Sequence, residues 1–399
     1  MRSILTSDRV LAPAYPQRRT RLLAPAFIPA LFLAFILTLC AGGSAHARPD
    51  ADGVRRIITE LGGKVAADAS VPGLSVAVLH KGGDDPVAVA FGTACIENAT
   101  PMTTQSRFKI GSVTKVFTGA LVHRFIEDGK LAYDTPIDRF FPGFPDGGAI
   151  TVRHLLEHTS GIVDMLGLAE VRANLVRAWA PADLIALVEK QPLAFRPGER
   201  QAYSNTGFLM LAVICERVSG RTYEDLVREM FAERLGMKSL LPGNDTAIVP
   251  RMACGYTTGG ENGALQLPMA ASVATAKGTG NLLATPSDVV RLVNLDRLLK
   301  NDVLGAVALE PLRLPDGQVA LKPDGSGLFN LGELDGCSLL LFPKPELALV
   351  GKLGLFPGFG AAYLYDRQTR TAVAISVNNE RAMGRIVLLG ADILRALRN

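Results

Sequence analysis

The sequence contains few aromatic residues and carries little excess charge outside its first segment. Aromatic side chains make up 6% of the 399 residues, with a single tryptophan, and charged side chains make up 20%. The formal net charge is +4, and residues 1–47 account for it with five arginines and one aspartate, so the remaining 352 residues have no net charge. A neutral body offers no electrostatic attraction to phosphates, and we therefore predict no nucleic-acid partner.

Neither disorder nor a fibrous repeat fits the composition. Hydrophobic residues make up 48% of the chain, which is enough apolar surface to offset the entropy cost of ordering a core. The 40 glycines and 24 prolines follow no regular period, which excludes a collagen-like or low-complexity chain. The composition predicts a folded globular protein.

Cysteine is also scarce, and four of the five cysteines lie beyond residue 47. They are Cys95, Cys215, Cys254 and Cys337. Their wide spacing contains no CxxC pair and excludes a dense disulfide scaffold, although three pairings are open in an oxidising compartment. Cys215 lies in the apolar, helix-like run 208–218, which favours a buried free thiol at that position.

The N-terminal segment has the pattern of a secretory signal peptide over residues 1–47. Arg18, Arg19 and Arg21 precede an uncharged apolar run from Leu22 to Leu39, and a stretch of small residues ends at Ala47. This order predicts cleavage after Ala47 and a periplasmic or secreted protein without a stable membrane span. The apolar run is just long enough to cross a bilayer, so an uncleaved anchor is the alternative.

Beyond residue 47, strand-like segments occur near both ends and helix-like segments in the middle. An amphipathic helix is predicted around residues 54–65, with two strands, 74–79 and 87–91, joined by a glycine-rich loop. Helices are predicted at 113–129 and 207–220, each ending at a glycine. The C-terminal part predicts strands 338–342, 347–353, 361–365 and 371–377, and a last helix at 386–397. This order predicts one α/β domain made of residues 48–110 and 300–399, with a mainly helical domain, 111–299, inserted and a cleft between them.

Two SxxK motifs are present, and local geometry distinguishes them. The motif from Ser106 to Lys109 lies in an alternating, strand-like stretch, where positions three apart point to opposite faces. The motif from Ser112 to Lys115 follows Gly111 and opens a helix, where the same spacing places both side chains on one face. The helix N-terminus would also supply unpaired N–H groups for an oxyanion. The alternative is that Ser112 only caps the helix.

Two further short motifs stand in contexts suited to a site. Tyr203-Ser204-Asn205 is the sole Tyr-x-Asn of the sequence and precedes a predicted helix. Lys352-Leu353-Gly354 lies on a predicted C-terminal strand. Without a partner motif, either one is also compatible with a purely structural role.

In this order and context, the three motifs resemble those of the serine β-lactamase and penicillin-binding protein superfamily. The Tyr-x-Asn motif is most similar to the branch of class C β-lactamases and D-alanyl-D-alanine carboxypeptidases. Family-like stretches also occur at residues 108–115, 154–161 and 203–220. The resemblance implies an α+β fold, in which an antiparallel sheet is flanked by helices and carries an inserted, mostly helical domain.

The resemblance also implies a role for each motif residue in a serine hydrolase. Ser112 would be the acylated nucleophile, Lys115 its proton acceptor, and Tyr203 the group that passes the proton to the leaving group. The lysine must be partly neutral to act as a base, and burial with a second cation nearby lowers its pKa. The implied substrate-binding residues are Asn205, Lys352, Gly354 and Leu355, and the main-chain N–H groups of Ser112 and Leu355 would form the oxyanion hole.

One position departs from the family pattern. The family usually has Thr or Ser between the Lys and the Gly of the third motif, where its hydroxyl helps to hold a substrate carboxylate, and this sequence has Leu353. The leading substrate is an amide such as a D-amino-acid peptide or a β-lactam, and peptidoglycan is a natural source of such peptides. A carboxylesterase on the same scaffold and a non-catalytic protein that binds cell-wall peptides are the alternatives.

A zinc site competes with this interpretation. His154 and His158 match the HxxEH pattern, which would place both histidines on one helical face, but Thr159-Ser160-Gly161 directly after them predicts a helix end. A Ser-His-Asp hydrolase would need a GxSxG turn, which the sequence does not contain. We therefore expect neither a metal ion nor an organic cofactor.

Overall fold

The computed structural model describes residues 50–259, 263–300, 334–335, 340–342 and 349–398. Residues 48–399 form one compact unit. The predicted signal peptide, residues 1–47, lies outside the described residues. Within the described ranges, no helix is both long enough and apolar enough to cross a membrane.

An eight-stranded antiparallel sheet joins the two ends of this unit. Its spatial order is β3-β2-β1-β13-β12-β11-β10-β9. The first strand, β1, pairs with the last, β13, from Leu74 opposite Val377 to His80 opposite Thr371. The bounds are β1 (Gly73–His80), β2 (Val87–Cys95), β3 (Thr100–Pro101), β9 (Leu334–Asp335), β10 (Leu340–Phe342), β11 (Leu349–Phe356), β12 (Phe359–Asp366) and β13 (Thr371–Val377). This confirms the predicted antiparallel sheet, although residues 338–339 and 347–348 of the predicted strands lie outside the described ranges.

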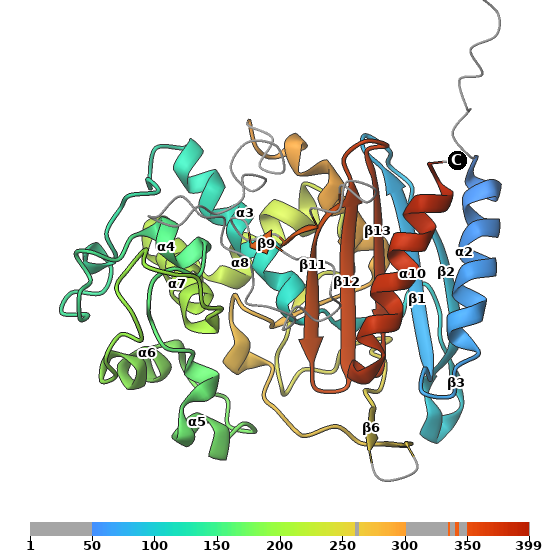
Figure 1. Ribbon diagram of the computed structural model, residues 1–399, viewed down its shortest axis with the longest axis horizontal. Coiled ribbons are helices and arrows are strands. Elements are labelled where there is room, and N and C mark those ends of the chain that lie inside the picture. Colours follow the sequence, from blue (N-terminus) through green and yellow to red (C-terminus); the bar gives the residue numbers. More distant parts are fainter. Residues whose placement is uncertain (1–49, 260–262, 301–333, 336–339, 343–348, 399) are drawn as a thin grey trace, which may run out of the picture. The chain divides into compact units, whose positions relative to one another are not determined.

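Helices α2 (Ala51–Ala66) and α10 (Met383–Ala396) pack side by side on one face of the sheet, as Figure 1 shows. The side chain of Asp50 caps α2 by accepting a hydrogen bond from the Gly53 N–H. Alternate strand residues such as Val76 and Ile375 face these helices in one apolar cluster. The strand residues between these positions point to the other face of the sheet. There they join residues of the helical region in a second and larger apolar cluster.

The helical region gathers on the β11 side of the sheet (Figure 1). Its helices are α3 (Thr114–Glu127), α4 (Val152–Leu156), α5 (Ala169–Ala173), α6 (Pro181–Glu189), α7 (Asn205–Ser219), α8 (Tyr223–Val227) and α9 (Pro286–Val289). Short helical turns lie at η1 (Ile96–Asn98), η2 (Gly111–Val113), η3 (Ile137–Arg139), η4 (Met165–Gly167), η5 (Arg228–Glu233), η6 (Ala274–Ala276), η7 (Val290–Arg297) and η8 (Glu380–Ala382). Helix α7 is buried from Thr206 to Cys215 and packs against α3. It ends at Gly220 in the left-handed conformation, as its sequence predicts.

Two small sheets complete the described part of the fold. Strands β4 (Phe108–Lys109), β8 (Leu282–Ala284) and β5 (Leu241–Pro242) form one, and β6 (Thr257–Gly259) with β7 (Ala264–Gln266) form the other. The α+β class predicted from the sequence is confirmed. The exact limits predicted for the inserted domain, 111 and 299, stay a prediction.

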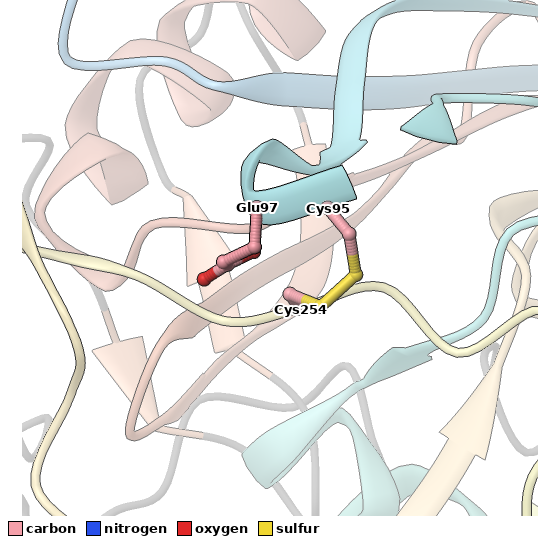
Figure 2. Close-up of side chains that lie close together, drawn as sticks. All are labelled: Cys95, Glu97 and Cys254. Carbon is pink, nitrogen blue, oxygen red and sulfur yellow. A yellow bond between two sulfur atoms is a disulfide. The ribbon is translucent and has the colours of Figure 1, made fainter. Parts of the chain in front are cut away.

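A disulfide connects the end of β2 to the chain before β6. Figure 2 shows the bond between Cys95 and Cys254, with Glu97 beside it. These three residues form a group whose potential metal-ligating atoms lie within 4.8 Å of one another, but both sulfurs are committed to the disulfide and the Glu97 carboxylate accepts a hydrogen bond from Tyr256 Oη. Cys215 is a buried free thiol, as predicted, and burial raises its pKa. Cys337 lies outside the described residues.

Candidate active site

Ser112 is positioned by the turn between β4 and α3. Gly111 has a positive φ of 50°, and the chain then passes through η2 into the helix. Val113, not Ser112, occupies the N-cap position of α3, and no side chain caps this helix end. The Ser112 Oγ instead lies 2.7 Å from Tyr203 Oη and 3.2 Å from Lys115 Nζ. The N-cap alternative for Ser112 is therefore wrong.

The other SxxK motif is not assembled into a site. Ser106 Oγ accepts a hydrogen bond from the Thr103 N–H, at 3.0 Å, so this serine closes a local turn. Lys109 Nζ lies over the ring of Phe356, 4.5 Å from its centroid. The two side chains have separate partners, as their strand-like context predicts.

Lys115 lies one helical turn after Ser112 and is completely buried. Its Nζ contacts Asn205 Oδ1 at 2.8 Å and the carbonyl oxygen of Thr279 at 2.9 Å, in addition to Ser112 Oγ. The pKa of Lys115 is held well below its ordinary value, first by burial and then by the positive charge of Lys352, while Asp164 opposes these effects. Lys115 therefore has the electrostatic environment of a base.

The partners of Lys115 also fix where its lone pair points. A neutral amine has two N–H groups and one lone pair. The carbonyl oxygens of Asn205 and Thr279 can only accept, so they take the two N–H groups. The remaining tetrahedral direction faces Ser112 Oγ. In its neutral form Lys115 is thus oriented to receive the hydroxyl proton of Ser112.

Tyr203 approaches Ser112 from the loop that precedes α7. The main chain of His158 holds this loop by accepting a hydrogen bond from the Ala202 N–H, and His158 Nδ1 accepts another from the Ser204 N–H. The His158 ring packs against the Tyr203 ring with centroids 4.5 Å apart. Lys115 Nζ lies 4.8 Å from the centroid of the Tyr203 ring, and Lys352 Nζ lies 5.8 Å from it. The amines of Lys115 and Lys352 thus both lie close to the phenol ring.

The histidines of the HxxEH pattern have structural roles in this region. Helix α4 ends at Leu156, and His158 follows it with a positive φ of 58°, so the two histidines do not share a helical face. His154 belongs to the capping box of α4, where its Nδ1 accepts from the Thr151 N–H. The common helical face that the HxxEH pattern implies is therefore absent here.

Asn205, the first residue of α7, connects Lys115 to Asp164. Its Nδ2 donates to Asp164 Oδ2 at 2.8 Å, and its Oδ1 accepts from Lys115. The carboxylate can only accept here, so it fixes the orientation of the Asn205 amide. Asp164 is itself anchored because its other oxygen accepts from the Leu166 N–H and caps η4. Asp164 and the Thr279 carbonyl were not predicted as site residues, because neither belongs to a recognisable motif.

Strand β11 forms the opposite wall through unusually close backbone packing. A Cβ on Gly354 would lie 2.0 Å from the carbonyl oxygen of Ile110, and a Cβ on Gly111 would lie 2.5 Å from that of Leu355. Only glycine permits this approach, which brings the main chain of Leu355 against the segment that carries Ser112. Lys352 is 2% exposed on the same strand. The structure therefore brings all the predicted site residues together.

The side chain of Leu353 faces away from this cleft. It is buried in the cluster between the sheet and helices α2 and α10, next to Ala362 on the paired strand. Strand alternation explains this, because Lys352 and Gly354 use the cleft-facing side of β11. Leu353 thus supplies no group to the cleft.

A pocket of about 280 Å³ opens beside Ser112. Its described lining is mostly apolar and includes Leu166, Leu175, Met269 and Phe356, with Asn205 next to the serine. Tyr203 and Lys352 are not among the described residues that line it. The described lining of the pocket thus includes the serine but not the phenol.

The chain is similar to several known proteins. A family model described as Beta-lactamase matches residues 54–395. Penicillin-binding protein 4* of Bacillus subtilis (strain 168) is 35% identical over 173 residues, which cover 43% of this chain and 37% of that protein. Esterase EstB of Burkholderia gladioli is 30% identical over 202 residues, covering 46% of this chain and 50% of that protein. The alignments thus span half or less of these two relatives.

Solved structures show the same fold. The crystal structure of D-amino acid amidase from Ochrobactrum anthropi SV3, complexed with L-phenylalanine amide, superimposes with a TM-score of 0.72. It shares 24% sequence identity, and the match covers 88% of this chain and 99% of that one. The likeness extends over nearly the whole amidase chain.

Proposed function

This chain belongs to the Beta-lactamase family, and on that premise we propose that it is a serine hydrolase that forms an acyl-enzyme on Ser112. The observation that carries the proposal is the hydrogen-bonded group in which Ser112 Oγ lies 2.7 Å from Tyr203 Oη and 3.2 Å from Lys115 Nζ. A serine hydroxyl becomes an effective nucleophile when an adjacent base takes its proton. Here two candidate bases contact the same oxygen.

The acylation step follows from this geometry. The Ser112 oxygen attacks the substrate carbonyl carbon while its proton passes to the Lys115–Tyr203 pair. The main-chain N–H groups of Ser112 and Leu355 stabilise the negative charge that develops on the carbonyl oxygen, and one such donor contributes on the order of a hundredfold in rate. Tyr203 delivers the proton to the leaving group, and water then hydrolyses the acyl-enzyme. Because Lys115 and Tyr203 are coupled, the proton belongs to the pair and not to one residue.

We propose an amide of cell-wall type, a D-amino-acid peptide or a β-lactam, as the leading substrate class. The similarity to a penicillin-binding protein supports this choice. A carboxylesterase is the second candidate, supported by the similarity to an esterase and by Leu353, which places no hydroxyl in the cleft for a substrate carboxylate. A non-catalytic peptide-binding role is disfavoured, because a pure binder needs no buried lysine beside a serine.

Export to the periplasm or the cell exterior is part of the proposal. The disulfide between Cys95 and Cys254 supports it, because such bonds persist in oxidising compartments. The signal-like segment 1–47 supports it independently. Peptidoglycan fragments would be accessible substrates in that location.

Covalent labelling tests the proposal. The purified protein is treated with a fluorophosphonate probe and with a fluorescent penicillin, alongside Ser112→Ala and the matched control Ser106→Ala. We expect Ser106→Ala to be labelled like the wild type and Ser112→Ala to remain unlabelled. A wild type that accepts neither reagent, and that turns over neither nitrocefin, a D-Ala-D-Ala peptide nor a short-chain ester, would contradict the hydrolase assignment. Labelling by fluorophosphonate without penicillin would favour the esterase.

A further inference from the structure

The pocket beside Ser112 contains one charged side chain among its described lining residues, that of Arg172. The other described lining residues are apolar or neutral, and two of them, Leu166 and Met269, are exposed by 37% and 64%. Within the described part of the chain, the Arg172 guanidinium makes neither a hydrogen bond nor an ion pair. Arginine offers five N–H donors in a planar fork that matches a carboxylate. An exposed arginine that no described residue pairs with thus lines an otherwise uncharged pocket beside the nucleophile.

The position of Tyr203 identifies which part of a substrate enters this pocket. In the proposed reaction Tyr203 gives its proton to the leaving group, so the leaving group lies beside the phenol. The pocket is lined by Ser112 and Asn205 but not, among the described residues, by Tyr203. It therefore receives the other substituent of the carbonyl, which is the acyl part that stays attached to Ser112.

The wall that carries Arg172 is connected to the wall that positions Lys115. Arg172 lies in α5, and the carbonyl oxygen of Leu175 just after this helix accepts a hydrogen bond from the Ser272 N–H at 2.8 Å. Thr275 Oγ1 accepts from the Trp179 N–H at 3.0 Å. These bonds join the segment after α5 to the loop that ends at Thr279. The pocket is thus largely formed before a substrate binds.

We propose that Arg172 forms an anion subsite for the acyl part of the substrate. The preferred substrates are then esters or amides whose acyl group is apolar next to the carbonyl and bears a carboxylate at its far end. The inference rests on the proposed function, since it assigns a substrate feature to the same site. It differs from the family pattern, in which the third motif helps to hold a carboxylate, because Leu353 faces away from the cleft here.

Matched pairs of chromogenic esters test the subsite. Two mono(4-nitrophenyl) esters carry a free carboxylate, that of 4-carboxybenzoic acid and that of adipic acid. Their neutral counterparts are 4-nitrophenyl 4-methylbenzoate and 4-nitrophenyl hexanoate. The kcat/KM of each ester is measured for the wild type, Arg172→Ala, Arg172→Glu and Arg172→Lys. Arg56→Ala is the control, because Arg56 is an exposed arginine on α2, remote from the pocket lining.

We expect Arg172→Ala to lower kcat/KM for at least one carboxylated ester about tenfold, the effect of one charge-assisted contact, while the neutral esters change less than about twofold. Arg172→Glu should lower kcat/KM for the same carboxylated ester further. Arg172→Lys should retain part of the preference for carboxylated over neutral esters, and Arg56→Ala should leave all the kcat/KM values unchanged. Added salt should weaken the preference. Equal losses for carboxylated and neutral esters, or no loss, would refute the subsite while leaving the hydrolase standing. A wild type that hydrolyses no ester and accepts no serine label would instead contradict the proposed function itself.

Discussion

The charge state of Lys115 can be shifted in opposite directions by two single substitutions. Burial and Lys352 lower the pKa of Lys115, and Asp164 raises it. Lys352→Gln removes the cation, and Asp164→Asn removes the anion. Asparagine keeps one of the two acceptor oxygens of Asp164, and in Asp164→Asn this oxygen can still accept from the Asn205 amide. The exposed Leu166 N–H, which loses the other oxygen, can bind water instead. Each substitution thus changes mainly the charge near the amine.

The expected size of the effect follows from the geometry. One side-chain amide separates Asp164 from Lys115 and contacts each at 2.8 Å. At a separation of roughly 6 Å and an effective dielectric constant of about 20, Coulomb's law gives about 3 kcal/mol. Asp164 is partly exposed, so solvent screening reduces this value, and we expect its removal to lower the pKa of Lys115 by less than the full Coulomb energy would give. Lys352 is the stronger influence and is buried, so its removal should raise the pKa by more.

The assay is the rate of fluorophosphonate labelling of Ser112 as a function of pH. Only neutral Lys115 can accept the hydroxyl proton, so the rate falls as the pH drops through the pKa of the amine. A neighbouring cation disfavours the ammonium form of Lys115. Losing Lys352 therefore stabilises that form and moves the acidic limb of the pH–rate profile to higher pH. An anion favours the ammonium form, so losing Asp164 moves the limb to lower pH. Asp50→Asn, which alters another helix-capping aspartate, should leave the limb in place.

Shifts in the same direction for Lys352→Gln and Asp164→Asn would refute this reasoning. Unshifted limbs in both variants would show that Lys115 is not the titrating base. A loss of rate at every pH without a shift in Asp164→Asn would show that the charge of Asp164 does not act on Lys115 and that the substitution only weakens the capping of η4.

Three further predictions concern the framework of the site. Gly354→Ala should reduce labelling at least about a hundredfold, because its Cβ would collide with a main-chain carbonyl oxygen at 2.0 Å, whereas Gly63→Ala, with nothing within 4 Å, should label normally. Leu353→Thr should lower the free energy of unfolding by about 2 kcal/mol in denaturant titrations without increasing penicillin labelling, since the side chain is buried away from the cleft. Replacing Cys95 and Cys254 together by alanine should lower the free energy of unfolding by between about 2 and 5 kcal/mol, because the bond closes a loop with a sequence separation of 159; an unchanged unfolding midpoint would contradict this.

The local part of the site was predictable from the sequence. Ser112 and Lys115 are three residues apart at the start of a helix, and helix geometry alone places them on one face. That the N-terminal and C-terminal strands contribute to one sheet-containing part of the fold was also predictable, because apolar segments of strand length occur near both ends. Tyr203 and Lys352 required the family resemblance, since nothing in their immediate surroundings indicates that they meet Ser112.

The amino-acid sequence was sufficient to identify the side chains that perform the proposed chemistry and the class of fold that holds them. How that chemistry is controlled became visible only in the folded chain. The Thr279 acceptor is a main-chain carbonyl, which every residue possesses and no motif reveals, and Asp164 acts through an amide 41 positions away. The pairing of Cys95 with Cys254 and the burial of the Leu353 side chain away from the cleft were fixed by long-range packing and strand register. Such contacts depend on distances between segments far apart in the chain, and local sequence patterns do not encode those distances.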